Sequence, residues 1–246
     1  MTQIGLYGKL PAHGDFLHRN LPTRTINNLD AWLQSWVGGA RERLGEHWLE
    51  HYLTAPVWRF ALSAGALDHN AWAGVALPSV DRVGRYFPLA LLAPLAEGAS
   101  PAAFAAGGGK WYERVEQAAL RALEGSITVE QMLESAGAPP PAPPPAPRRA
   151  AAEPGVVLHS PGPAALAVPA LLEAFVLNSF PSYSIWATAG SDCVERCAVI
   201  VQGMPSSRNA CALLDGRFAE WGLVDALWLG LFEGGGLADG GFGQVG

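Results

Sequence analysis

Cysteine is scarce in this chain of 246 residues. Cys193, Cys197 and Cys211 are odd in number and no export signal precedes them, so we expect reduced thiols rather than a disulfide framework. Cys193 and Cys197 are four residues apart, which is not the spacing of a redox pair or zinc knuckle, and no histidine lies close by in sequence. The sequence therefore predicts packed thiols, no metal site and no cofactor.

Long apolar runs are also missing, although the mean hydropathy of +0.15 is high. No run approaches the roughly 20 residues that a helix needs to cross a bilayer. The longest candidate, residues 164–180, contains Pro169, Glu173 and Asn178 and predicts a buried helix instead. The N-terminus lacks the basic region, apolar region and cleavage site of a signal peptide. We therefore expect a soluble, cytoplasmic protein without membrane insertion.

Basic residues are few and scattered. The formal net charge is −6, and Arg148-Arg149 is the one pair of adjacent basic residues. Binding to the phosphate backbone of a nucleic acid requires a basic patch or stripe, which this sequence does not provide. The composition therefore excludes DNA and RNA as expected partners.

Apolar patterns in the first half predict helices and strands that alternate. Helical spacing of apolar residues predicts a helix that Gly38-Gly39 ends, followed by a second helix from residue 40 to 53. The next three apolar runs predict strands, because each lacks the alternation of a half-exposed strand and fits a central strand covered on both faces. They span residues 57–64, 71–77 and 86–93, with a hairpin turn at 67–70. Further helices are predicted at 101–124 and 128–135.

A segment rich in alanine and proline divides the chain at residues 136–154, and we interpret it as an exposed polyproline II linker. The part that follows is small for an independent core, and its predicted strands at 182–187 and 197–201 are expected to complete the same sheet. We therefore expect a single α/β domain over residues 1–233, interrupted by this linker. The glycine-rich tail at 234–246 is expected to be disordered.

Two loops that follow strand ends carry the residues of most interest. They contain these candidate site residues: Lys9, His13, Asp15, Ser79, Asp81, Arg82 and Arg85. One interpretation is purely structural, with Asp81 paired to Arg82 or Arg85 or bound by backbone N–H groups, and with Lys9 or His13 paired to Asp15. Another is a surface for a partner, to which Arg82 and Arg85 offer forked donors.

Catalytic interpretations of the same loops are weaker. Ser79, His13 and Asp81 contain the residue types of a hydrolytic triad, but Ser79 is not in a Gly-x-Ser-x-Gly elbow. The glycines of the first loop match neither the dinucleotide-binding fingerprint nor the P-loop, and Lys9 is not followed by Ser or Thr. We therefore expect no catalytic residues.

Three ordered segments resemble the TagF (ImpM) family of bacterial type VI secretion accessory proteins. They are Gly5-Leu6-Tyr7-Gly8-Lys9-Leu10-Pro11 with Gly14-Asp15-Phe16, then Ala55-Pro56-Val57-Trp58-Arg59-Phe60, and then Pro78-Ser79-Val80-Asp81-Arg82-Val83-Gly84-Arg85-Tyr86-Phe87-Pro88-Leu89. The resemblance covers roughly residues 3–125 and implies a three-layer α/β/α sandwich, in which we expect a mixed central sheet.

The resemblance also implies a role. Members of the family repress type VI secretion after translation by engaging a forkhead-associated-domain scaffold protein, in opposition to activation by threonine phosphorylation. We therefore expect a regulator that binds this scaffold protein through the two loops and is not an enzyme. The alternatives are a hydrolase that uses Ser79, His13 and Asp81, and a structural accessory subunit of the secretion apparatus.

Overall fold

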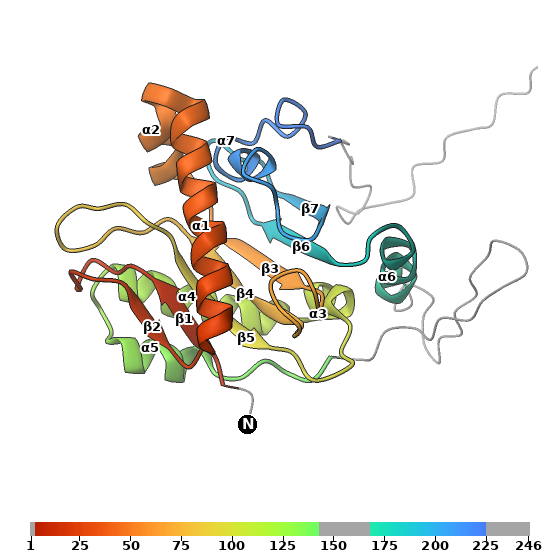
Figure 1. Ribbon diagram of the computed structural model, residues 1–246. Coiled ribbons are helices and arrows are strands. Elements are labelled where there is room, and N and C mark those ends of the chain that lie inside the picture. Colours follow the sequence, from red (N-terminus) through yellow and green to blue (C-terminus); the bar gives the residue numbers. More distant parts are fainter. Residues whose placement is uncertain (1–2, 143–167, 225–246) are drawn as a thin grey trace, which may run out of the picture.

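Seven strands form one sheet in the computed structural model of the chain, which describes residues 3–142 and 168–224 (Figure 1). Their order across the sheet is β2-β1-β5-β4-β3-β6-β7. The strands are β1 (Gly5–Gly8), β2 (Leu17–Arg19), β3 (Trp58–Leu62), β4 (Trp72–Leu77), β5 (Leu89–Pro94), β6 (Tyr183–Thr188) and β7 (Cys197–Gln202).

Every pairing between these strands is antiparallel, so the expected mixed sheet is wrong. Most neighbours in the sheet are also neighbours in the chain, and short connections make them hairpins, which are necessarily antiparallel. A parallel pair would need a crossover of a dozen or more residues. The predicted hairpin at 67–70 is confirmed, because β3 and β4 pair on either side of it. All six residues of β4 are buried, as predicted for a central strand.

One long helix crosses the first face of the sheet. Helix α1 (Thr23–Leu44) continues through Gly38 and Gly39, where the sequence predicted a stop. Gly39 is buried, and a side chain there would meet the backbone oxygen of Ser207 at 3.0 Å, so this glycine permits close packing rather than a break. The helix ends instead at Gly45, whose φ of +54° favours glycine. A short 3-10 turn, η1 (Gly45–His47), then leads into α2 (Trp48–Thr54).

Three helices lie on the opposite face. The helix predicted at 101–124 is divided into α3 (Pro101–Gly107) and α4 (Gly109–Leu123), because the chain turns at Gly108, where a Cβ would meet the Phe104 backbone oxygen at 2.8 Å. The predicted helix at 128–135 is confirmed as α5 (Val129–Ala136). Its capping box is present, since the Gln131 amide donates to Thr128 Oγ1 and the Thr128 amide donates to Gln131 Oε1.

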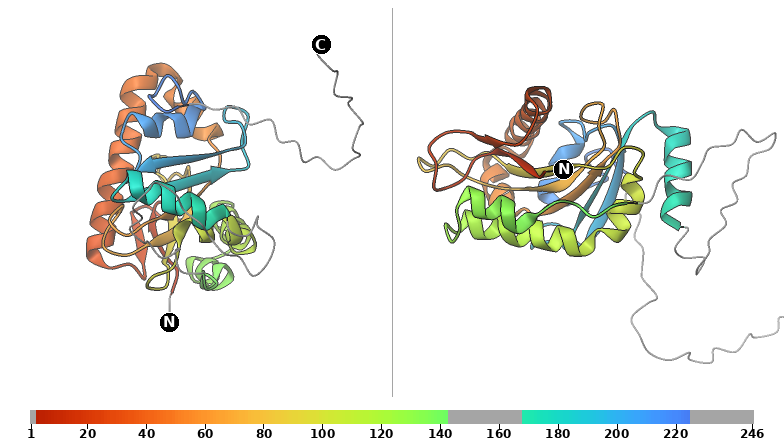
Figure 2. Two further views of the ribbon diagram at one scale, coloured as in Figure 1. Left: turned by 90° about the vertical axis from the view of Figure 1, so that its right-hand side faces the viewer. Right: turned by 90° about the horizontal axis from the view of Figure 1, so that it is seen from below.

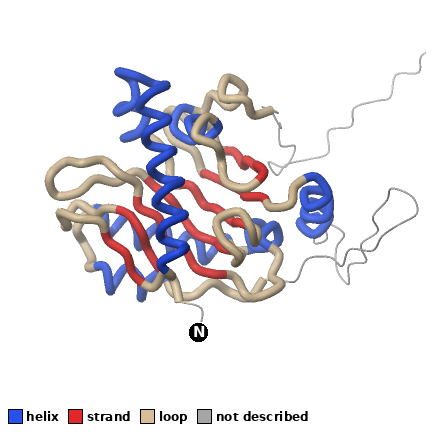
Figure 3. The backbone as a smooth tube through the Cα atoms, viewed as in Figure 1, coloured by secondary structure: helices blue, strands red, loops and turns tan. Residues whose placement is uncertain are grey.

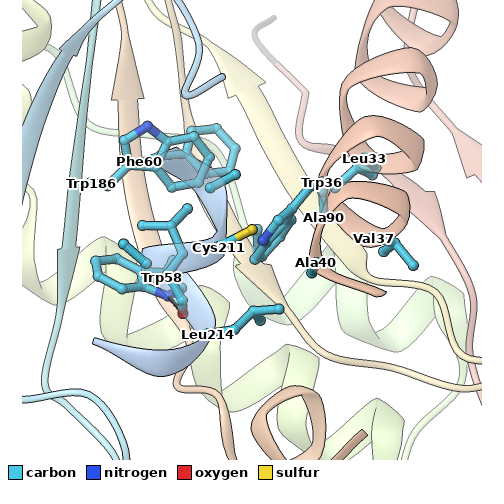
Figure 4. Packing of buried hydrophobic residues seen from close by; sticks show 14 of the residues in the cluster. Leu33, Trp36, Val37, Ala40, Trp58, Phe60, Ala90, Trp186, Cys211 and Leu214 are labelled. Atoms are coloured by element: carbon cyan, nitrogen blue, oxygen red, sulfur yellow. Dashed lines mark hydrogen bonds between the residues drawn. The ribbon is translucent and has the colours of Figure 1, made fainter. Parts of the chain in front are cut away.

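Each face of the sheet has its own apolar core, and Figure 2 shows the helices on the two sides. The first core joins α1 and α2 to β3 and to the C-terminal helices, and the second joins α4 and α5 to β4 and β5. Figure 4 shows the first core, where Trp36 of α1 lies beside Cys211 and where Trp186 packs against Phe60 with 5.1 Å between ring centroids.

The part after the linker adds the last two strands to the sheet. It consists of α6 (Val168–Ser179), β6, β7, the 3-10 turn η3 (Asn209–Cys211) and α7 (Ala212–Asp215) (Figure 3). Strand β6 pairs with β3, and the indole nitrogen of Trp58 donates to the Leu213 oxygen at 2.8 Å. The predicted linker from residue 143 onward and the predicted tail at 234–246 lie outside the described residues, so the single-domain boundaries stay a prediction.

Within the described ranges, no helix combines the length and the apolar character that crossing a bilayer requires. The three cysteines form no disulfide. Cys211 is fully buried, and its burial raises the pKa of the thiol.

Candidate functional site

The sheet brings the two predicted loops together. Strand β1 ends at Gly8 and pairs with β5, so the loop after Gly8 meets the loop that precedes β5. Gly8 has a φ of +139°, and a Cβ there would lie 2.2 Å from the Pro88 oxygen, which makes glycine necessary at this crossing. The chain topology alone therefore places Lys9 next to the segment that contains Ser79 and Asp81.

Asp81 is the centre of the site. Its side chain is fully buried, and Lys9 Nζ lies 2.9 Å from Oδ2, while Arg85 Nε donates to the same oxygen at 2.6 Å. The other oxygen, Oδ1, accepts the backbone N–H groups of Val83 and Arg85 at 3.0 and 2.9 Å. One carboxylate thus receives four donors from two segments of the chain, which is how a buried charge is compensated.

This environment decides the protonation state of Asp81. Burial by itself would raise the pKa of the carboxyl, but the hydrogen bond from Lys9 and those from Arg85 and Val83 outweigh it. The pKa is therefore held well below its ordinary value, and Asp81 stays ionised near neutral pH.

Arg85 connects the second loop to the first loop at the protein surface. Its guanidinium donates to Asp81 and also to the Gly14 backbone oxygen, and it lies 3.9 Å from the exposed carboxylate of Asp15. A backbone bond of 2.9 Å from the Arg82 N–H to the His13 oxygen adds a second connection. The expected pairing of Lys9 or His13 with Asp15 is wrong, since Lys9 turns inward to Asp81 and the Arg85 guanidinium approaches Asp15.

The described hydrogen bonds of Ser79 connect it to other parts of the fold. Its Oγ donates to the Lys9 backbone oxygen at 2.6 Å. Its own backbone is bound by Tyr52 of α2, whose hydroxyl donates to the Ser79 oxygen at 2.9 Å and accepts the Ser79 N–H at 3.0 Å. Burial raises the pKa of Tyr52, so the phenol stays protonated and can both donate and accept a hydrogen bond. Ser79 therefore connects α2, the first loop and the second loop.

An aromatic cluster beside the Lys9–Asp81 ion pair was not predicted from the sequence. Phe16 stacks on Tyr7 with 5.8 Å between ring centroids and meets Phe87 edge-on at 4.8 Å. The ammonium of Lys9 lies 4.8 Å from the Phe16 centroid, which adds a cation–π contact. Phe16 lies in the Gly14-Asp15-Phe16 motif that the sequence singled out. Its contact with Phe87, however, depends on how distant strands are ordered in the sheet.

We call four of the exposed residues of the two loops the two-loop surface: Asp15, Phe16, Arg82 and Val83. Arg85 is exposed as well. Phe16 is 44% exposed and Val83 is 67% exposed. The Arg82 guanidinium has no hydrogen bond or ion pair to any described residue, whereas that of Arg85 is engaged. Of the two arginines that were predicted to offer forked donors to a partner, only Arg82 therefore has an unengaged guanidinium in the described contacts.

The residues of the proposed triad are not connected as a triad in the part of the chain that the structure describes. No hydrogen bond joins His13 to Ser79 or Asp81 there, and Ser79 Oγ and both Asp81 oxygens have other partners. His13 instead lines a groove with Arg19, Thr128 and Glu130. The described residues also contain no cluster of His, Cys, Asp and Glu suited to a metal ion.

Comparisons with known proteins agree on one relationship. Residues 5–138, which include both loops, match the family described as "TagF N-terminal domain, Type VI secretion system-associated". The crystal structure of PA0076 from Pseudomonas aeruginosa PAO1 is similar, with a TM-score of 0.78 and 34% sequence identity over 93% of this chain and 99% of that chain. No curated protein matches the chain.

Proposed function

Because this chain belongs to the TagF N-terminal domain family, which is associated with the type VI secretion system, we propose that it represses that system after translation. It does so in the cytoplasm by binding the forkhead-associated-domain scaffold protein of the apparatus and keeping it from assembly. Family membership supports the connection to secretion. The geometry of the two loops supports a mechanism based on binding.

The observation that carries the binding mechanism is the four-donor contact of Asp81. It joins two loops that are distant in sequence and fixes their backbones before any partner arrives. A surface that is already ordered loses little conformational entropy on association, so more of its contact energy appears as affinity. The two-loop surface therefore has the rigidity that a recognition site needs.

The chemistry of this surface suits a protein partner. Phe16 and Val83 offer apolar area, and Arg82 offers forked donors to a carboxylate or phosphoryl group. Aromatic residues and arginine are enriched among the residues that dominate binding energy in protein interfaces. We assign the principal contacts to Phe16 and Arg82, with Arg85, Asp81 and Lys9 positioning them.

Binding rather than catalysis is also favoured by the state of the polar groups. A nucleophilic Ser79 would need a base within hydrogen-bond reach, and its hydroxyl is bound to a backbone oxygen instead. Asp81 is surrounded by cations and amides and has little tendency to accept a proton. We accordingly propose that the chain has no hydrolase activity.

The test is a binding titration between the purified chain and the purified scaffold protein. Arg82→Ala should weaken binding by about tenfold, as expected when a central interface arginine is lost. Arg121→Ala is the matched control, because this arginine is also exposed but belongs to α4 and not to either loop. Equal affinity of both variants, or no binding by the native chain, would show that the proposed surface or partner is wrong.

A cellular measurement separates a repressor from a structural subunit. Deleting the gene should increase type VI secretion, and complementation with the Arg82→Ala variant should restore repression only in part. A structural subunit would instead be present in stoichiometric amounts in the purified apparatus, and its deletion would abolish secretion. Either of those two results would contradict the repressor proposal.

A further inference from the structure

A groove runs along the last strand of the sheet. Strand β7 stands at the edge, and among the described residues it pairs only with β6. Beside it lies a groove of about 1200 Å³, lined by β7 and by residues that include 193, 195–196, 215–218 and 222–224. The outer edge of such a strand presents backbone N–H and C=O groups that a further strand can bind.

The groove combines an apolar strip with polar lining residues, among them Glu195, Arg196, Asp215 and Arg217. The following apolar side chains line it and are partly buried against the first core: Cys193, Cys197, Val199, Met204 and Leu223. The middle of β7, Ala198-Val199-Ile200-Val201, has no charged residue. An apolar edge strand of this kind favours association with another chain unless something covers it. A segment that covers these apolar side chains would therefore be favoured.

The chain itself brings an occupant to this place. Val224 is the last residue that the structure describes before the C-terminal segment, and it lies at the groove, 97% exposed. The residues that follow it are Asp225-Ala226-Leu227-Trp228-Leu229-Gly230-Leu231-Phe232, which are mostly apolar and contain no proline. Extended, these eight residues would span about 26 Å, compared with about 20 Å for a six-residue strand such as β7.

We propose that residues 225–232 occupy this groove, extended along β7, with Trp228 and Phe232, which share one face of an extended segment, against its apolar lining. Covalent attachment at Val224 gives the segment a millimolar effective concentration, which favours it over any second molecule. The segment thus covers the edge of the sheet and keeps the chain from pairing through β7. This assignment is independent of the two-loop surface and of the repressor function.

The cysteines of the groove provide the test. Cys193 and Cys197 line it, whereas Cys211 is fully buried in the core and serves as an internal reference. The full chain would be treated with a maleimide, and labelling at each cysteine followed by mass spectrometry. Trp228→Asp should accelerate labelling of Cys193 and Cys197 by about tenfold, because a charge opposes burial of the segment. Cys211 should stay slow.

Phe242→Asp is the matched control, since it places the same charge in the same tail but beyond the proposed segment. It should label like the native chain. If Trp228→Asp also accelerates Cys211, the variant has lost its fold, and a second measurement decides. In a chain that ends at Val224, labelling should be fast, and an added peptide of residues 225–233 should slow it while a scrambled peptide should not.

Three results would overturn the assignment. The first is equal labelling of the native chain and the Trp228→Asp variant, with no effect of the peptide on the shortened chain. The second is protection of Cys193 that rises with protein concentration alongside dimer formation, which would assign the groove to a second copy. The third is protection that arises only when the scaffold protein is added, which would assign it to that partner.

Discussion

Lys9 Nζ and Asp81 Oδ2 lie 2.9 Å apart, although 72 residues separate the two side chains along the sequence. The exposed fraction is 6% for the Lys9 side chain and 0% for that of Asp81. This contact attaches the loop after β1 to the loop before β5, and the two-loop surface rests on it.

We expect Lys9→Met to destabilise the protein, because it leaves a buried carboxylate with one cation fewer. The melting temperature should fall by about 5 °C or more. Lys110→Met is the control, since Lys110 is exposed on α4 and should change the melting temperature little. Equal thermal melts of the two variants would show that the buried pair is not required for stability.

We expect acid to lower the free energy of unfolding, in part because it protonates the carboxylate of Asp81. Because the folded-state pKa of this carboxyl lies below its ordinary value of 3.8, its ionisation stabilises the fold above that pH. The contribution is lost as the pH falls from about 4 towards the lower folded-state pKa. Asp81→Asn should therefore be less stable than the native chain at pH 6, with a difference that narrows below pH 4.

Urea denaturation of both proteins between pH 6 and pH 2 measures this narrowing. A stability difference that stays constant over the whole range would mean that the Asp81 carboxyl does not titrate differently on unfolding. It would contradict the charge environment described for the site.

Tyr52→Phe should lower the free energy of unfolding by about 1–3 kcal/mol, because it removes the group that binds both the N–H and the oxygen of buried Ser79. Tyr86→Phe is a close control. Tyr86 packs against Tyr52 with 5.9 Å between ring centroids, but its hydroxyl has no hydrogen bond to a described residue. Its replacement should change the free energy of unfolding by less than about 0.5 kcal/mol in chemical denaturation.

The adjacent glycines of α1 should respond differently to substitution by alanine. Gly38 is exposed, and a Cβ added there would meet no described atom of another element within 4 Å, so Gly38→Ala should stabilise the helix by roughly 0.5–1 kcal/mol. At Gly39 the same methyl group would meet the Ser207 oxygen at 3.0 Å and Arg43 Nη1 at 2.9 Å. Gly39→Ala should therefore be neutral or destabilising, and a gain equal to that of Gly38→Ala would refute the close contact.

The local patterns of the sequence predicted single elements well. The unbroken apolar runs identified the central strands β3, β4 and β5, and Thr128 with Gln131 identified the start of α5. These features depend on residues within a few positions of each other. The two glycines of α1 misled the prediction, because the reason for Gly39 is a contact with Ser207 in the last part of the chain.

The sequence predicted which residues belong to the candidate site but not which of them contact each other. The sequence offered several acceptable partners for Asp81, and only the pairing of β1 with β5 shows that Lys9 reaches it. The engagement of the exposed Arg85 guanidinium has the same origin, since it donates to the Gly14 oxygen across the two loops. Strand direction was likewise missed, because an apolar run fits a parallel or an antiparallel central strand equally well.

The pairing of β3 with β6 has a consequence during synthesis. The Tyr183 N–H donates to Ser63 Oγ across 120 residues of sequence. At 5–20 residues per second, a ribosome needs on the order of 10 s to produce that partner. For this interval the newly made β3, with Trp58 and Phe60, has a neighbour on one side only. A nascent chain stalled in the predicted linker would therefore display an unpaired strand edge of the kind that promotes aggregation.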